Sequence, residues 1–442
     1  MPLDRSKREY LMTLYIVTLG LVVLFVIGIP IGFSLGIVGF LGYISESGSR
    51  IIVDMLAQRM QSGVNNFLLL AIPLFILAAK LMNTSGITYR IFNFARALVG
   101  FLPGGLGHAN TVASLIFSGM SGAAVVDAAG LGQIELEAMR DGGYDDDFSV
   151  AITAASSTIG PIFPPSIPMV IFGLVAELSI GRLFLGGVVP GLLMTVLLML
   201  MVGWYASRKG YRRTPFPPLK TLLGYTAKAI LPLMTPAILL GGIWTGHFTA
   251  TEAAAVAVAY ALVLGLLVYR ELTVADIGQI LIATSKETAA IGFIVCAANF
   301  FGWLLMRSGL TTTLAEGIGA LSTEPLVILL LINVFLLVVG CFMEPVVAIL
   351  ILGPVLMPVI TKVGIDPLHF GVVMVLNLMI GLLTPPFGVV LFVMAGVSRM
   401  PFERVVKATF PFLLPLLIVL IMITVFPWLV TALPDLLLPN KF

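Results

Sequence analysis

Two short proline-rich stretches of this sequence combine residue types that can bind a small cation. They are ASSTIGPIFPPSIPMVIFG (155–173) and MIGLLTPPFGVVLFV (379–393), and both are strongly apolar, with hydroxyl side chains close to the prolines. Proline has no N–H, so each one leaves the carbonyl four residues earlier without its helical partner. Freed carbonyls and hydroxyls are oxygen ligands of the kind that bind sodium at interrupted membrane helices. The helix that resumes, near Ser166 or Phe387, begins with partial positive charge that can face an anionic group.

The freed carbonyls fall at matching places in the two stretches. They belong to Ser157, Gly160 and Pro161 in the first stretch and to Gly381 and Leu382 in the second. In hydrocarbon, irregular backbone persists only where it is buried in protein or lines a wet cavity. The simpler alternative is that the prolines only kink two packed helices. One motif alone favours that alternative, whereas two copies in a matching register favour a binding site.

The surrounding chain has the composition of an integral membrane protein. Its 442 residues are 59% hydrophobic and 10% charged, which is more apolar than a soluble core requires. The apolar tracts reach the length of about 20 residues that a membrane-spanning helix needs. They lack the short alternating segments of an outer-membrane barrel. The sequence therefore predicts an all-α polytopic membrane protein.

Several other function classes lack their sequence motifs. The chain contains no GxxxxGK[ST] phosphate loop, no HExxH and no GxSxG. His108, His247 and His369 are far apart and have no metal-ligand spacing. Cys296 and Cys341 lie in apolar segments and are expected to be buried without a disulfide. The formal net charge of +2 says little about partners, because so few charges are present. From the missing motifs we expect the chain not to be an enzyme, and we expect no nucleic-acid partner.

An internal repeat relates the two proline stretches. An offset of 221 residues pairs Gly119 with Gly340, Gly132 with Gly353, Gly143 with Gly364, Gly160 with Gly381, Pro164 with Pro385, Pro165 with Pro386 and Pro190 with Pro411. Further upstream the register slips by two, so that NTSGIT (83–88) lies opposite MRSGLT (306–311). Weak repeats whose helices are interrupted at corresponding places are typical of secondary transporters that bind their substrate at the repeat interface.

A basic stretch near the middle of the chain separates the two halves. We expect a first half over 1–205, a linker over 206–226 and a second half over 227–442. By the positive-inside tendency, the linker faces the cytoplasm; its basic residues are Arg208, Lys209, Arg212 and Arg213.

Each half contains two segments that are awkward as simple membrane spans. The proline breaks interrupt helices over about 146–176 and about 367–397. Segments 65–86 and 286–309 carry polar residues inside or at their ends. Each of these two is either a re-entrant hairpin or an ordinary span, and the residues alone leave both open.

A few charged residues also lie in or beside apolar segments. Asp127, Glu252 and Glu344 each cost free energy in a membrane unless paired or hydrated. Asp127 and Glu344 fall in the paired windows, where they either tune a binding site or close a structural hydrogen-bond network. The acidic run Asp145 to Asp147 is expected to be a solvated loop between helices.

Four motifs together resemble the large membrane subunit of the tripartite ATP-independent periplasmic (TRAP) transporters. They are SGMSGAAVVDAAGLGQIELEAM (118–139), GGYDDDFSVAITAASSTIGPIFPPSIPMVIFG (142–173), FTATEAAAVA (248–257) and LNLMIGLLTPPFGVVLFV (376–393). The likeness extends over essentially the whole chain. It implies two inverted repeats with re-entrant helical hairpins and discontinuous helices, arranged as an elevator-type transporter. It also favours the hairpin interpretation of 65–86 and 286–309.

The resemblance further implies a multi-pass protein of the bacterial or archaeal cytoplasmic (inner) membrane. Its function would be sodium-coupled import of an organic anion of the carboxylate or sialic acid class, with two or more sodium ions as coupling ions. The implied partners are a small four-helix membrane subunit and a periplasmic substrate-binding protein, and we expect the small subunit to be a separate polypeptide. A stand-alone sodium or proton antiporter of related architecture is the alternative.

The family's binding residues carry over to matching positions of this chain. One sodium site resembles Ser121 with backbone oxygens near Gly160, Phe163 and Pro165. The other resembles the backbone from Gly340 to Phe342 with Gly381, Thr384 and Pro386. The substrate is expected between the two sites, near Ser121, Ala123, Asp127, Ser156, Thr158, Ser166 and Asn377. Many members of the family read SGSA where this chain reads SGAA, so a hydroxyl is missing at Ala123.

Overall fold

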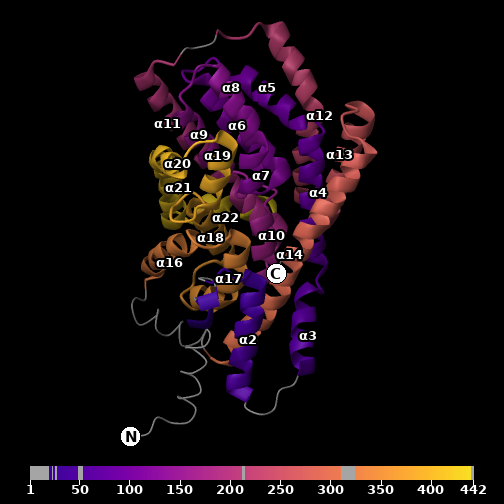
Figure 1. Ribbon diagram of the computed structural model, residues 1–442, viewed down its shortest axis with the longest axis vertical. Coiled ribbons are helices and arrows are strands. Elements are labelled where there is room, and N and C mark those ends of the chain that lie inside the picture. Colours follow the sequence, from indigo (N-terminus) through magenta and orange to yellow (C-terminus); the bar gives the residue numbers. More distant parts are fainter. Residues whose placement is uncertain are drawn as a thin grey trace.

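A computed structural model describes residues 19–21, 23–24, 27–47, 53–211, 215–309 and 324–439. Within these ranges every secondary-structure element is a helix (Figure 1). Seven helical segments of this part are long and apolar enough to cross a membrane: Phe67–Thr84, Ile180–Lys209, Leu219–Trp244, Ala250–Val268, Val274–Arg307, Pro345–Lys362 and Phe402–Val425. The predicted all-α polytopic membrane protein is confirmed.

The helices of the first half precede the basic linker. They are α2 (Ile31–Ser47), α3 (Val53–Val64), η1 (Phe67–Leu70), α4 (Ala71–Thr84), α5 (Ile87–Val99), α6 (Gly105–Ser121), α7 (Ala124–Ala129), α8 (Leu131–Asp141), α9 (Asp146–Ser157), α10 (Ile167–Val175) and α11 (Ile180–Lys209).

The helices of the second half follow the linker. They are α12 (Leu219–Trp244), α13 (Ala250–Val263), η2 (Leu264–Val268), α14 (Val274–Arg307), α16 (Pro325–Gly340), α17 (Pro345–Lys362), α18 (Pro367–Gly381), α19 (Val389–Ser398), α20 (Phe402–Thr409), η3 (Phe410–Phe412), α21 (Leu413–Val425) and α22 (Trp428–Leu437).

Helix α6 and the pair α7–α8 form an antiparallel hairpin. Its tip is Gly122, which has a positive φ of 61°, followed by Ala123 in an extended conformation. Further from the tip, the Asn110 amide of α6 donates to Glu135 of α8 over 2.8 Å. Leu106, at the start of α6, lies against Gly142, just after α8. A glycine tolerates the left-handed conformation at no steric cost, which allows the chain to reverse there.

The repeat predicted from the sequence appears in the packing of the two halves. In the first half α6 runs parallel to α9, and the Ser156 hydroxyl donates to the Asn110 amide oxygen over 2.7 Å. In the second half α16 runs parallel to α18, and the Asn377 amide donates to the Asn333 amide oxygen over 3.0 Å. Asn333 follows Asn110 by 223 residues and Asn377 follows Ser156 by 221, as the register slip requires.

The two discontinuous helices lie side by side and antiparallel. Thr153 of α9 and Met394 of α19 both lie against Gly132 of α8. At the other end, the rings of Phe172 in α10 and Phe370 in α18 are 6.0 Å apart between centroids. Helix α10, at the end of the first discontinuous helix, therefore packs against α18, at the start of the second. Helix α9, at the start of the first, lies beside α19, at the end of the second. The two halves are thus inverted relative to one another.

The predicted hairpins at 65–86 and 286–309 are wrong in position. Phe67–Thr84 is one helical segment, and 286–307 lies inside α14, which is uninterrupted from Val274 to Arg307. The polar residues that suggested turns have helix caps or partners on other helices instead. The Asn66 side chain caps η1, and Lys80 of α4 pairs with Glu287 of α14 at 2.6 Å. The hairpin of the first half is α6 with α7–α8.

The linker is shorter than predicted, because α11 continues to Lys209 and α12 begins at Leu219. Arg212 and Arg213, which were expected in it, lie outside the described residues.

The acidic run is solvated, as expected, but it forms the start of α9 rather than a loop, and each of its carboxylates is paired. Asp145 pairs with Lys209, Asp146 with Arg140 and Asp147 with Arg404, at 2.9, 2.7 and 2.6 Å. The hydrogen bond from Lys209 holds the pKa of Asp145 below its usual value. The run therefore joins the starts of α9 and α20 and the ends of α8 and α11.

Candidate functional site

The hairpin tip of the first half touches the break between α9 and α10. A Cβ placed on Gly122 would lie 2.6 Å from the Pro165 carbonyl oxygen. The backbone N–H of Ile167 donates to the Gly122 carbonyl over 3.4 Å. Ser121 is the last residue of α6, and its side chain lies outside the described part of the structure. The backbone next to Ser121 thus meets the proline break, as the first predicted sodium site requires.

The second half brings the end of α16 against the end of α18. A Cβ placed on Gly381 would lie 2.5 Å from the carbonyl carbon of Gly340. Only glycine allows this approach of two backbones, because any side chain would overlap the neighbouring helix. The two glycines expected in the second sodium site are therefore in direct contact.

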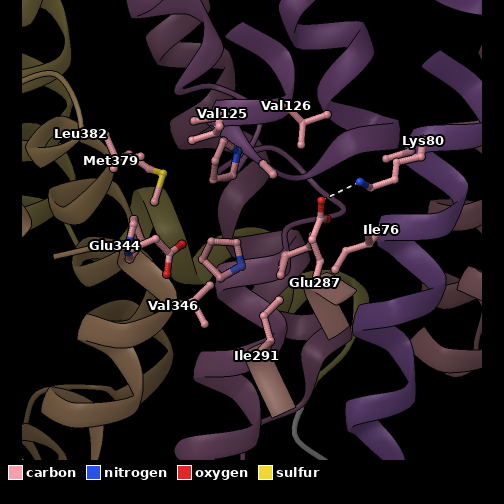
Figure 2. A pocket seen from close by; sticks show the side chains of 17 residues that line it. Ile76, Lys80, Val125, Val126, Glu287, Ile291, Glu344, Val346, Met379 and Leu382 are labelled. Atoms are coloured by element: carbon pink, nitrogen blue, oxygen red, sulfur yellow. Dashed lines mark hydrogen bonds and ion pairs between the residues drawn. The ribbon is translucent and has the colours of Figure 1, made fainter. Parts of the chain in front are cut away.

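A cavity of about 160 Å³ lies between these two regions and the pair α4–α14 (Figure 2). The hairpin tip contributes Ala123 to Val126, and the start of α17 with its N-cap contributes Glu344 to Val346. The wall opposite comes from α4 and α14. The remaining lining residues are Ile76, Ala79, Lys80, Pro161, Ile167, Pro168, Glu287, Ile291, Met379 and Leu382. The cavity thus lies where the two inverted halves meet.

Three charged side chains line this otherwise apolar cavity. Glu344 is the N-cap of α17, and its carboxylate accepts a hydrogen bond from the Val347 N–H over 3.3 Å. On the opposite wall, the Lys80 ammonium and the Glu287 carboxylate form the 2.6 Å ion pair drawn in Figure 2. Glu344 therefore fits both interpretations of its role, since it caps a helix and also faces the cavity.

The remaining residues of the first predicted sodium site lie around the break. Gly160 faces the buried carboxyl of Asp127, whose Oδ2 would lie 2.4 Å from a Cβ at this glycine. Phe163 lies on the other side and packs against Gly191 of α11. The Pro161 carbonyl, predicted to be free, accepts a hydrogen bond from the Ser166 hydroxyl.

The second predicted sodium site is more open. The Thr384 N–H donates to the Gly381 carbonyl over 3.0 Å, and its hydroxyl donates to the Ile380 carbonyl over 2.9 Å. The Gly381 carbonyl thus has one partner and retains one lone pair for a further ligand. Phe342 and Pro386 are exposed, and the Phe342 ring lies 5.9 Å from that of Phe387.

Among the described residues predicted to contact the substrate, only Ala123 lines the cavity. Ser166 caps α10 by accepting from the Met169 N–H over 3.1 Å, and the Thr158 hydroxyl donates to the Ala155 carbonyl. The others, Asp127, Ser156 and Asn377, are buried behind the lining. The structure therefore assigns several of these polar groups to the support of the cavity wall.

A buried polar network behind the hairpin was missed by the sequence reasoning. The Asn110 amide donates to both Glu135 and Thr153, and Ser156 bonds to Asn110 and Ser114. Asn110 and Asn333 recur at the repeat offset of 223 residues, a signal that was present in the sequence. The pairing of Lys80 with Glu287 had no such signal, because it joins residues 207 positions apart.

Comparison with known proteins gives one family. The family model described as "Tripartite ATP-independent periplasmic transporter, DctM component" matches residues 18–429. The chain is 48% identical to the sialic acid TRAP transporter large permease protein SiaM of Vibrio cholerae, over 93% of this chain and 96% of the relative. It is 38% identical to the C4-dicarboxylate TRAP transporter large permease protein DctM of Pseudomonas aeruginosa, over 91% and 94%.

Among solved structures, the YdaH transporter of Alcanivorax borkumensis has a similar fold. The TM-score is 0.65 at 16% sequence identity, and the match covers 95% of this chain and 98% of that one. At this identity the likeness concerns the fold alone.

Proposed function

This chain belongs to the DctM family of large permeases of tripartite ATP-independent periplasmic transporters, and we propose that it imports an organic anion by coupling it to sodium. It is a multi-pass inner-membrane transporter and not an enzyme. The observation that carries the proposal is the cavity at which the hairpin tip, both proline breaks and the α4–α14 wall meet.

Two features support sodium as the coupling ion. In each half a glycine at a helix end lies against other backbone beside a proline break: Gly122 against the Pro165 carbonyl, and Gly381 against Gly340. Carbonyl oxygens at broken helices are the ligands used for sodium in secondary transporters. We therefore assign one sodium ion to the Gly122–Pro165 contact and one to the Gly340–Gly381 contact.

The names of relatives support an organic anion as the cargo. They include transporters for sialic acid, isethionate, 2,3-diketo-L-gulonate and C4-dicarboxylates. All of these compounds carry an acidic group that is ionised at neutral pH. The cavity of about 160 Å³ is smaller than the roughly 300–1,000 Å³ of ordinary ligand pockets. An acid larger than the cavity would enter only after the walls of the cavity move apart.

Movement of the hairpin and the discontinuous helices against α4 and α14 would supply that change. The cavity lies between the α4–α14 pair on one side and the hairpin with the discontinuous helices on the other. Within each of these two groups the helices pack against one another. We propose that the bundle of hairpins and broken helices moves as a body, as in an elevator-type transporter. The proposed partners are the small four-helix membrane subunit and a periplasmic binding protein that delivers the substrate.

Reconstitution into proteoliposomes tests this function. The chain, the small subunit and the binding protein together should accumulate labelled sialic acid or succinate when sodium is high outside, and the chain alone should transport little. Equal uptake when choline replaces sodium would contradict sodium coupling. Robust sodium–proton exchange by the lone chain, without anion uptake, would instead show a stand-alone antiporter.

A further inference from the structure

Lys80 is the only cationic side chain among the described residues that line the cavity. It projects from α4, and its ammonium meets the Glu287 carboxylate of α14 at 2.6 Å (Figure 2). The rest of the lining is apolar except for Glu344 on the opposite wall. An anion entering this cavity therefore meets one cationic side chain, which is already paired with Glu287.

The two members of the ion pair are unequally covered. The Lys80 side chain is 23% exposed, whereas that of Glu287 is 49% exposed. A charged group within a membrane protein needs either a partner or water. Lys80 is therefore the more covered member of the pair, and it requires another anion if the pair opens.

We infer that Lys80 is the residue that binds the acidic group of the substrate, and that Glu287 takes the place of that group while the cavity is empty. This inference rests on the proposed function, since it identifies how an organic anion is held. On entry, the carboxylate of the substrate accepts the hydrogen bond from Lys80 Nζ and Glu287 turns to water. No covalent bond changes, and the lysine keeps one anionic partner throughout.

Glu344 fixes the direction of the bound substrate. Figure 2 shows its carboxyl turned toward the cavity from the wall opposite Lys80. Because Lys80 lies on the other wall, an acid held there by its carboxylate places its far end toward Glu344. The other end of the substrate then faces an oxygen acceptor, which favours acids that also carry hydroxyl or amide donors.

A purely structural ion pair makes different predictions, and the chain offers a matched control. Arg90 of α5 and Glu271 form an ion pair at 2.7 Å whose side chains are 24% and 41% exposed. It therefore resembles the Lys80–Glu287 pair in length and coverage, but it does not line the cavity. Removing the Glu271 charge measures the cost of losing an ion pair without touching the substrate, whereas Arg90 also donates to the Gly86 carbonyl and lies over the Tyr269 ring.

The test compares initial uptake rates of labelled sialic acid and of succinate in proteoliposomes that contain the three-component system. Lys80→Gln should raise the KM of the transported acid roughly ten- to hundredfold, the loss expected for a charged hydrogen bond. The control variant Glu271→Gln should leave the KM within about twofold. Glu287→Gln should lower the KM or leave it unchanged, because the substrate no longer competes with an internal carboxylate.

The charge-reversed variant Lys80→Glu/Glu287→Lys separates the two explanations most sharply. It restores an ion pair but moves the cation to α14, so we expect uptake to stay impaired. Lys80→Arg keeps the cation on α4 and should retain much of the uptake. Recovery of uptake on charge reversal, or an unchanged KM in Lys80→Gln, would overturn the inference alone. Failure of the unaltered system to take up either acid would overturn the proposed function and the inference with it.

Discussion

Gly381→Ala tests the contact between α16 and α18 because the geometry leaves no room for a methyl group. The new Cβ would lie 2.5 Å from both the Cα and the carbonyl carbon of Gly340 and 2.7 Å from its oxygen. Carbon atoms in contact are normally about 3.5–4.0 Å apart, so the two backbones must separate by about 1 Å. Overpacking of this kind costs about 1–3 kcal/mol, and the helix preference of alanine offsets up to about 1 kcal/mol of it.

The net loss of about 0–3 kcal/mol is small enough for the protein to remain folded. The displaced carbonyls are those that we assign to sodium, so the half-saturating sodium concentration for uptake should rise about tenfold, which corresponds to about 1.4 kcal/mol. Sodium titration of uptake in proteoliposomes measures this shift, and thermal unfolding in detergent checks the fold.

Gly396→Ala is the matched control, since it lies in α19 and a Cβ there meets nothing within 4 Å. It should leave the sodium dependence unchanged and stabilise the helix slightly. An unchanged half-saturating sodium concentration in folded Gly381→Ala would refute the assignment of an ion to this contact.

Three further substitutions test other parts of the structure. Thr384→Ala removes the hydroxyl that donates to the Ile380 carbonyl. It should weaken sodium activation of uptake severalfold without loss of folded protein. Unaltered sodium activation would show that Thr384 is not part of the sodium site. Asn377→Leu leaves the buried Asn333 side chain with fewer partners, which should destabilise the protein by about 1–3 kcal/mol, measured as a lower unfolding temperature. Asp147→Asn breaks a half-exposed ion pair with Arg404. The free energy of unfolding should fall by less than about 1 kcal/mol, and by less still at high salt. A larger loss of thermal stability would show that the pair acts within a coupled network.

The breaks in the two discontinuous helices were predictable because they follow from covalent structure. A proline lacks its N–H wherever it stands, so Pro164 and Pro385 interrupt helical bonding regardless of their neighbours. The inverted packing of the two halves could be expected only from the family resemblance. It depends on which helices approach one another in space.

The hairpin of the first half was misplaced because its turn contains no proline. Gly122 and Ala123 reverse the chain within a run of small residues that also suits a continuous membrane helix. Polar residues in 65–86 and 286–309 gave a misleading signal of a turn. Their partners, such as Glu287 for Lys80, lie far away in the sequence.

The roles of the predicted site residues stay predictions, because sequence shows less about side chains than about backbone. Sequence motifs identify which backbone positions come together, as for Gly340 and Gly381. They do not show which side chains face the cavity and which support it from behind. Ser156 and Asn377 are polar residues at matching positions of the repeat, yet both are engaged in buried hydrogen bonds.

Sodium co-transport can be measured as the entry of radioactive sodium into proteoliposomes that contain the three-component system. We expect external sialic acid or succinate to stimulate sodium entry in proportion to the anion taken up, and we expect Gly381→Ala to reduce this sodium entry at low sodium concentration. Anion uptake without any accompanying entry of labelled sodium would contradict sodium co-transport.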